Sequence, residues 1–307
     1  MTETGAAEAA ARPIDPRIRH AMRILENEQS PLPDTATLAA RVGLSRFHFV
    51  RLFTAQIGLS PQDYGRSLVI MHAANRLRYS RDPVAVVARD FGYARQATFN
   101  KAFTRHHGLA PARWRRQAQR EIVPVSAEGV RLERLPVQRC LARRYFGPRD
   151  LTGSQWRDFA SRLPDALRDR PRLGFAYDDP RVTPPGRIRH DCAVVVGQDV
   201  VLGPGLVAEG FEILHSPAGL WAVAEVTPAT VSAGYRAIAD GWFQARATHA
   251  FEGDPHLERY RTTPGGEVVV AVAMRVRPVA RPGGWNMAVV PPDAPPAMPR
   301  RAGQPPA

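Results

Sequence analysis

Two stretches of the sequence carry side chains that could read the edges of DNA base pairs. Arginine and lysine suit the acceptor atoms of guanine, glutamine and asparagine suit adenine, and an aromatic ring can contact the methyl group of thymine. The candidate residues are Arg46, Phe47, Val50, Arg51, Arg95, Gln96, Asn100 and Lys101. Their spacing predicts that the members of each stretch share one face of a helix.

Each stretch also carries an apolar face that would fix its helix on a protein core. Phe49 and Phe53 lie four residues apart in the first stretch, as do Phe99 and Phe103 in the second. Residues four apart lie on the same side of a helix. Burial of these rings would therefore expose the candidate DNA-binding residues on the opposite side.

The two stretches belong to a unit of sequence that occurs twice. A shift of 50 residues aligns Phe49 with Phe99, Arg51 with Lys101, Phe53 with Phe103, Gly58 with Gly108, Pro61 with Pro111 and Tyr64 with Trp114. Each unit predicts a helix, a glycine turn at Gly43 or Gly92, and a second helix, which is helix-turn-helix spacing. The alternative is a helical bundle whose polar faces are only solvated. Two copies in register favour DNA binding.

The positive charge of the chain is concentrated in the same region. The first 120 residues hold 19 Lys and Arg against 9 Asp and Glu, whereas the remainder of the 307 holds 23 against 20. A basic domain attracts the phosphate backbone of DNA. We expect Arg46, Arg105, Arg113, Arg115 and Arg116 to bind phosphate. With 44% hydrophobic and 23% charged residues, the chain is globular rather than fibrous or fully disordered.

Residues 17–119 resemble the DNA-binding domain of the AraC/XylS family of transcription factors. The motifs that carry the resemblance are Leu38-Ala39, Val42-Gly43-Leu44-Ser45, Arg51-Leu52-Phe53, Gly58-Leu59-Ser60-Pro61, Phe91-Gly92-Tyr93 and Gly108-Leu109-Ala110-Pro111. The resemblance implies two helix-turn-helix units joined by a long helix over about residues 61–79. At ~1.5 Å per residue that helix measures roughly 28 Å, close to the ~34 Å of one turn of DNA. The family pattern adds Ala97 to the base-reading residues, and we expect methyl contacts at Val50 and Ala97.

From about residue 130 the pattern changes from helical to mixed. Strand-like runs at 194–196, 220–226 and 268–276 alternate with helical stripes that begin at Trp156 and Val231. The order strand, helix, strands occurs twice, which predicts an α+β domain of two similar halves. The expected divisions are a disordered leader at 1–14, a DNA-binding domain at 15–120, a linker at 121–129, an effector-binding domain at 130–280 and a disordered tail at 281–307.

One carboxylate in this second region could do chemistry. Glu258 lies in a probable strand next to Tyr260, and a carboxylate directed inward among aromatic side chains is costly without a positive partner. A cationic, apolar ligand could supply that charge, with cation–π contacts. Arg259, Arg261 or another arginine could equally supply it. The candidate ligand-binding residues are Glu258, Tyr145, Trp156, Trp221, Trp242 and Tyr260.

This region resembles the GyrI-like effector-binding domains. The residues that carry the resemblance are Tyr177-Asp178-Asp179-Pro180, Thr183-Pro184, Arg189 and Glu258-Arg259-Tyr260. The resemblance implies a two-fold repeat of strand-helix-strand-strand, with a pocket between the halves and the pocket acid at Glu258. The chain departs from the family pattern after Gly147-Pro148, where Arg149 stands in place of a tyrosine. The rim of the pocket is therefore expected to differ there.

Together these patterns predict a one-component bacterial transcription regulator. It would bind double-stranded DNA and a small apolar effector that could be cationic, with RNA polymerase as a further candidate partner. Two alternatives stay open: the C-terminal domain is a small-molecule hydrolase with Glu258 as general base, or it binds another protein.

Other sequence features predict absences. Cys140 and Cys192 are too few for a disulfide framework, which fits a cytoplasmic protein that associates with the nucleoid. The longest apolar stretch, at 268–274, is too short to span a bilayer, so no membrane partner is expected. No metal site, cofactor or catalytic residue is predicted.

Overall fold

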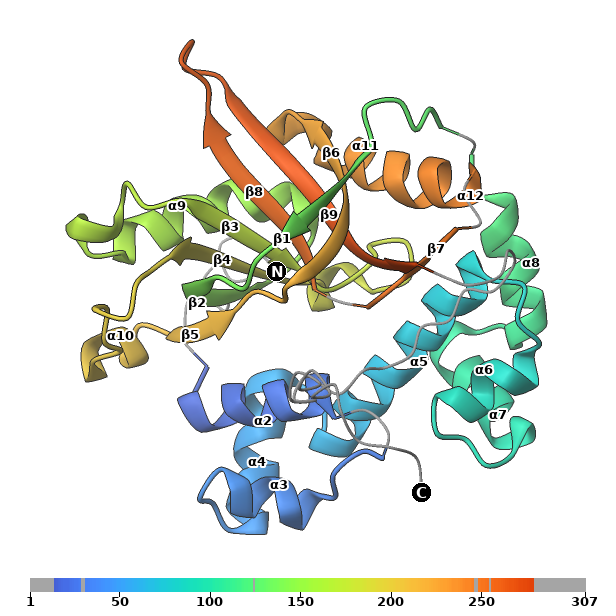
Figure 1. Cartoon of the computed structure of the whole chain (residues 1–307). Helices are drawn as coiled ribbons and strands as arrows, with labels where there is room; N and C mark the ends of the chain where they lie inside the picture. The colour runs from blue at the N-terminus through green and yellow to red at the C-terminus, as the bar shows by residue number, and fades with distance from the viewer. Residues whose placement is uncertain (1–13, 29–30, 124, 246–247, 254, 279–307) are drawn as a thin grey trace, which may run out of the picture.

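The computed structural model describes residues 14–28, 31–123, 125–245, 248–253 and 255–278. The predicted tail at 281–307 lies outside the described residues, and so does the predicted leader apart from Ile14. Figure 1 shows helices from the N-terminal part of the chain beside a large sheet from the C-terminal part. Within the described ranges, no helix is long and apolar enough to cross a membrane.

The N-terminal region is helical, as the sequence predicts. Its described helices are α2 (Pro16–Asn27), α3 (Thr35–Arg41), α4 (Arg46–Ile57), α5 (Pro61–Tyr79), α6 (Val84–Asp90), α7 (Gln96–His107) and α8 (Pro111–Arg120). Ser60 caps α5 by accepting a hydrogen bond from the Asp63 backbone N–H. This helix contacts α2 and α4 on one side and α6, α7 and α8 on the other, so it joins the two helix pairs.

The C-terminal region is an antiparallel sheet with helices, an α+β fold. The strands are β1 (Arg131–Leu135), β2 (Arg139–Phe146), β3 (Arg172–Ala176), β4 (Arg189–Val195), β5 (Phe211–His215), β6 (Gly219–Val226), β7 (His249–Phe251), β8 (His256–Thr262) and β9 (Val268–Pro278). The main helices are α9 (Thr152–Arg162), α10 (Pro204–Ala208), α11 (Val231–Arg236) and α12 (Phe243–Ala245), the last two joined by a π-helical segment at Ala237–Trp242. The strands are ordered β1-β6-β9-β8-β3-β4-β2-β5, with β7 on β9.

The register of the strands places α9 and α11 on the same face of this sheet. Glu258 pairs with Gly174, which pairs in turn with Cys192, and Glu258 also pairs with Val272. Side chains at paired positions lie on one face. Cys192 packs beneath α9 and Val272 beneath α11, so Glu258 lies between the two helices on what we call the helix face.

The opposite face of the sheet carries a second core and meets the N-terminal helices. Asp191 pairs with Phe175, and Phe175 pairs with Leu257. These residues alternate with those of the helix face, because successive side chains of a strand point to opposite sides. The core on this face includes the fully buried Trp221.

Candidate DNA-binding face and effector site

The helix pairs α3–α4 and α6–α7 have the same turn geometry. Gly43 and Gly92 both have positive φ, at 68° and 81°, a conformation that glycine adopts without steric strain. In both turns the amide of the next residue donates to a carbonyl five residues earlier, at 2.9 Å. The repeated sequence therefore folds into repeated local structure.

Equivalent aromatic rings hold α4 and α7 on the helical core. The fully buried rings are Phe49, Phe53, Phe99 and Phe103. Phe53 contacts Tyr64 at a ring-centroid distance of 5.7 Å, and Phe103 contacts Trp114 at the same distance. The aligned pair Tyr64 and Trp114 thus occupies the same place in the two units.

Burial of these rings leaves the predicted DNA-binding residues at the surface. The exposed ones are Arg46, Phe47, Arg51, Arg95, Gln96, Ala97 and Lys101. Val50 and Asn100 are half-buried. Phe47 is 90% exposed, an unusual position for an aromatic ring. Within the described part of the chain, no ion pair involves the four basic residues of this set.

On the helix face of the sheet, Glu258 is fully buried and surrounded by donors. Its Oε1 accepts hydrogen bonds from Arg149 at 2.8 Å and from the Tyr235 hydroxyl at 3.0 Å. Its Oε2 accepts one from the Tyr260 hydroxyl at 2.6 Å, and the Nε2 atom of His190 lies 3.4 Å away. The positive partner that the sequence left open is therefore Arg149, since Arg259 pairs with Glu133 instead.

These contacts hold Glu258 in its charged form. Burial alone would raise the pKa of this carboxyl group, but the nearby His190 ring, the Arg149 charge and the Tyr260 hydroxyl lower it well below the ordinary value. A carboxylate with a low pKa is a weak general base. The hydrogen bonds that already occupy both oxygens of Glu258 likewise offer no support for the hydrolase alternative.

Only some of the predicted ligand-binding residues come together. Trp156 packs edge-on against Tyr260, with ring centroids 4.8 Å apart, so both lie beside Glu258. The Tyr145 hydroxyl donates a hydrogen bond to Asp158 of α9 at 2.8 Å. Trp221 is buried on the opposite face, and Trp242 is buried in a core with Phe243 and His249.

Three residues of this site were not among the predicted ligand contacts: Arg149, His190 and Tyr235. Tyr235 lies on the helical stripe that the sequence shows, and Arg149 is the residue that departs from the family pattern. Both signals were present, but neither indicates a contact with Glu258. His190 carries no sequence signal of its own.

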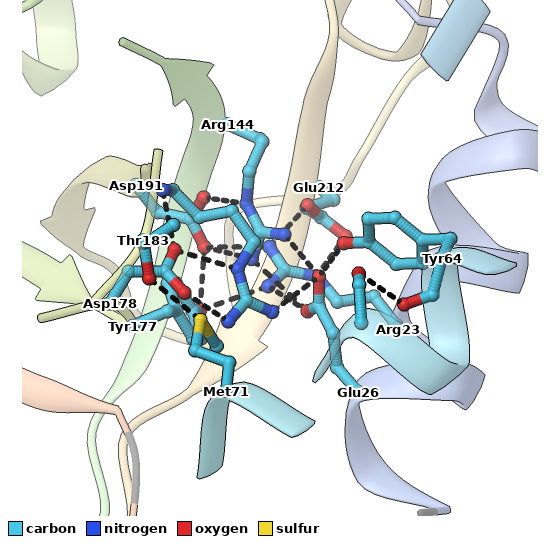
Figure 2. Close-up of polar contacts among 12 residues, drawn as sticks. Arg23, Glu26, Tyr64, Met71, Arg144, Tyr177, Asp178, Thr183, Asp191 and Glu212 are labelled. Atoms are coloured by element: carbon cyan, nitrogen blue, oxygen red, sulfur yellow. Dashed lines mark hydrogen bonds and ion pairs between the residues drawn. The ribbon is translucent and has the colours of Figure 1, made fainter. Parts of the chain in front are cut away.

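A buried cluster of charges joins the two regions. Figure 2 shows Glu26 of α2 facing Arg144 of β2. Glu26 pairs with Arg144 at 2.6 Å and Arg189 at 3.2 Å, and it accepts a hydrogen bond from the Tyr64 hydroxyl at 2.9 Å. Asp191 pairs with Arg144 at 2.5 Å. We call these residues, with Arg23, Tyr177, Asp178 and Glu212, the interdomain cluster.

The arginines of this cluster keep its acids ionised. Although burial alone would raise it, the pKa of Glu26 is lowered to about 2 by the charges of Arg144, Arg189 and Arg23. The second acid, Asp191, accepts hydrogen bonds from Arg23 and from the Tyr177 hydroxyl, both at 2.7 Å. The contacts between the helical region and the sheet thus join α2 to β2 and β4.

Cavities lie where the two regions meet. The larger, of about 540 Å³, extends between the helices and the sheet, and its lining includes Ile57, Leu68, Met71, Phe146 and Arg189. The smaller, of about 190 Å³, lies beside Arg149 and Tyr235 and reaches Asn75 and Tyr79 of α5. In the described ranges, no group of three or more histidine, cysteine or acidic side chains could hold a metal ion.

Comparison with known families identifies both regions. Residues 38–117 match the model of a helix-turn-helix domain, and residues 150–277 match that of a GyrI-like small-molecule-binding domain. These two domains define the class of the chain. It carries an AraC-type helix-turn-helix domain at its N-terminus and a GyrI-like domain at its C-terminus.

Similar curated proteins match part of the chain. The chain is 33% identical over 79 residues to an uncharacterized HTH-type transcriptional regulator of Haemophilus influenzae, with 26% of each chain covered. It is 24% identical over 102 residues to the lactose operon transcription activator of Staphylococcus xylosus, covering 33% of this chain and 37% of that protein. It is 29% identical over 92 residues to the multiple antibiotic resistance protein MarA of Escherichia coli, covering 30% and 72%. The first two relatives are therefore matched over well under half of their length.

Solved structures are similar to part of the chain. The DNA-binding domain of AdpA, in complex with a target DNA, is 27% identical, with 36% of this chain and 95% of that one covered and a TM-score of 0.30. SAV2435, bound to tetraphenylphosphonium, is 13% identical, with 48% and 93% covered and a TM-score of 0.35.

Proposed function

We propose that this chain is a sequence-specific DNA-binding transcription regulator whose C-terminal domain binds a small apolar effector. The observation that carries the proposal is the pair of equivalent helices α4 and α7. Each buries two phenylalanine rings. On the opposite side α4 exposes Arg46, Phe47 and Arg51, and α7 exposes Gln96, Ala97 and Lys101. On α4 the exposed Phe47 could contact a thymine methyl group while Arg51 reaches a guanine.

We further propose two helix-turn-helix units, α3–α4 and α6–α7, within a domain of residues 15–120. A linker at 121–129 would lead to an effector domain of residues 130–280 with a two-fold repeat. The strand order supports the repeat, because the sheet runs β8-β9-β6-β1 on one side of its centre and β3-β4-β2-β5 on the other. Each half contains a strand, a helix and two later strands.

The interdomain cluster offers a physical route from effector to DNA. A ligand changes DNA binding only if it favours one of two states of the protein. Glu26 belongs to α2 of the DNA-binding region, whereas Arg144 and Arg189 belong to β2 and β4 of the effector domain. An effector that shifts these strands would change the contacts of α2, and we propose that the signal passes there.

We also propose that the protein acts without catalysis, cofactor or metal, in the cytoplasm on nucleoid DNA. The names of the relatives, which are transcription regulators, support a role on DNA rather than in catalysis. RNA polymerase is a candidate partner. The Arg149 partner of Glu258 argues against the hydrolase alternative, since a carboxylate already paired with a guanidinium is a poor acceptor for a proton from water.

Selection of genomic fragments by the purified full chain, at near-physiological salt, tests the proposal. We expect the retained fragments to share a site with two segments about one turn of DNA apart, ~34 Å. The double variant Arg51→Ala/Lys101→Ala serves as control and should lose this enrichment. Fragments without any shared sequence would contradict sequence-specific regulation.

A further inference from the structure

The contacts of Arg149 are those that a protein would offer to an organic cation. Its guanidinium donates to Glu258 Oε1 at 2.8 Å, and its Cζ atom lies 4.7 Å from the centre of the Tyr235 ring. Charge pairing with a carboxylate and stacking on an aromatic face are the two usual means of binding a cation. The side chain of Arg149 is only 19% exposed, so the pairing is largely removed from water.

The position of Arg149 makes it part of the chain's connection between sheet and helix. It begins a single 3₁₀ turn, Arg149–Leu151, which leads from β2 into α9. Its partner Glu258 lies on β8, more than a hundred residues away in sequence. The guanidinium is therefore a tethered group brought to Glu258 by the fold.

We propose that Arg149 is an internal ligand that occupies the cation-binding position at Glu258, so that this domain excludes cationic effectors and accepts uncharged ones. This proposal rests on the proposed effector-binding role of the C-terminal domain. It assigns the specificity of the site to Arg149, the residue that departs from the pattern of the family.

Two physical effects support the exclusion. A tethered group competes with free ligands at a high effective concentration, in the millimolar range for short flexible connections. An external cation that displaced Arg149 would also leave that guanidinium without a negative partner, because one buried carboxylate neutralises one charge. An uncharged molecule pays neither cost, and the cavity of about 190 Å³ next to Arg149 gives it space.

Chemical complementation of Arg149→Ala tests the proposal with n-propylguanidinium as the probe. In the full-length variant, the probe should restore the missing partner of Glu258 and raise the melting temperature by about 2–4 °C at saturating concentration. The wild-type protein should not respond, because its site is filled. Neutral n-propylurea, which has nearly the same shape but no charge to pair with Glu258, should not replace the missing guanidinium of Arg149→Ala.

Matched variants complete the experiment. Arg236 lines the same cavity but pairs with Asp240 rather than Glu258. Arg236→Ala should therefore show no response to the probe, like the wild type. Arg149→Ala/Glu258→Gln should lose the response to the probe. An equal response of wild type and Arg149→Ala, or a response that survives Glu258→Gln, would overturn the proposal.

Two further measurements keep the outcome decisive. Should Arg149→Ala not fold, Arg149→Gln keeps part of the aliphatic stem and a polar end group but neither the full length nor the charge of arginine, and direct calorimetric titration with the same probe then gives the answer. DNA binding is measured in parallel. If Arg149→Ala or Arg149→Gln binds DNA but not the probe, the internal-ligand proposal alone is overturned, whereas a wild type without sequence-specific DNA binding overturns the proposed regulator.

Discussion

Two phenylalanines near the start of α4 have opposite surroundings. Phe47 is exposed to solvent, whereas Phe49 is fully buried and lies 5.7 Å from Phe53 between ring centroids. We propose that the same residue type serves recognition at one position and stability at the other. The helical spacing in the sequence is sufficient to predict this division, because it separates the two rings onto different faces.

Phe47→Ala should leave the free energy of unfolding nearly unchanged and weaken binding to the selected DNA site. Phe49→Ala should instead cost about 3–5 kcal/mol of stability, since it leaves a cavity in the core. Denaturant unfolding and fluorescence anisotropy measure the two effects. A large stability loss in Phe47→Ala, or unchanged DNA affinity, would contradict the assigned role of this ring.

Arg51→Ala and Lys101→Ala should each weaken specific DNA binding by about 1–3 kcal/mol. The physical reason is the loss of hydrogen bonds to base edges from an exposed side chain that has no ion pair within the described residues. Arg168→Ala, which removes a surface arginine of the C-terminal domain, is the control. Wild-type affinity in both variants would remove these residues from the recognition face.

The partner of Glu258 shows the limit of sequence reasoning at this scale. The need for a positive charge beside a buried carboxylate follows from physical chemistry. The choice among 41 arginines does not, because it depends on the register of β8 and on the turn after β2. In the same way, aromatic composition cannot separate Trp156, which lies beside Tyr260, from the core residue Trp221.

At the scale of elements, the sequence predicts best those helices that have both a helical spacing of apolar residues and an N-cap residue. The long helix was expected at about residues 61–79, and α5 spans Pro61–Tyr79 with Ser60 as its cap. The strand expected at 194–196 is longer, since β4 begins at Arg189. Its first residues, Arg189, His190 and Asp191, are polar because they serve the two buried charge sites, so the apolar run marks only the end of the strand.

The repeated units differ in their helix caps, and one of these differences allows a stability prediction. Ser60 accepts a hydrogen bond from the Asp63 N–H at 3.1 Å, whereas the equivalent Ala110 heads α8 without a side-chain cap. Ala110→Ser should therefore raise the free energy of unfolding by about 0.5–1 kcal/mol. Ala112→Ser, inside the same first turn, is the control and should not stabilise. Equal effects in the two variants would contradict capping as the cause.

At the scale of the whole molecule, the docking of the two regions could not be predicted. The sequence indicates two domains but contains no pattern that brings Glu26 to Arg144 and Arg189. These residues are ordinary surface types, and their burial depends on how α2 meets the sheet (Figure 2). The interdomain cluster is therefore a finding of the structure.

Glu26→Gln should cost about 3–5 kcal/mol, because it leaves buried arginines without their negative partner. The pKa of Glu26 is about 2, below its ordinary value near 4.5, so its ion pairs stabilise the protein above about pH 4.5. That contribution is lost as the pH falls from 4.5 towards 2. The free energy of unfolding, measured against pH, should thus fall more steeply in the wild type than in Glu26→Gln.

A control for this prediction lies two residues further along the chain. Glu28 pairs with Arg41 at the surface, where both side chains are more than 40% exposed. Glu28→Gln should change the free energy of unfolding by less than about 1 kcal/mol. Similar losses of unfolding free energy in the two variants would show that burial does not strengthen the contribution of Glu26 to stability.

The central claim is that one chain reads DNA with two equivalent helices. It is tested most directly by measuring the affinity of wild type, Arg51→Ala and Lys101→Ala for a selected site that is substituted base by base. We predict that Arg51→Ala relaxes the sequence preference in one segment of the site only, and that Lys101→Ala relaxes it in the other segment. Loss of preference in the same segment with both variants, or a uniform loss of affinity with no change of preference, would contradict the account.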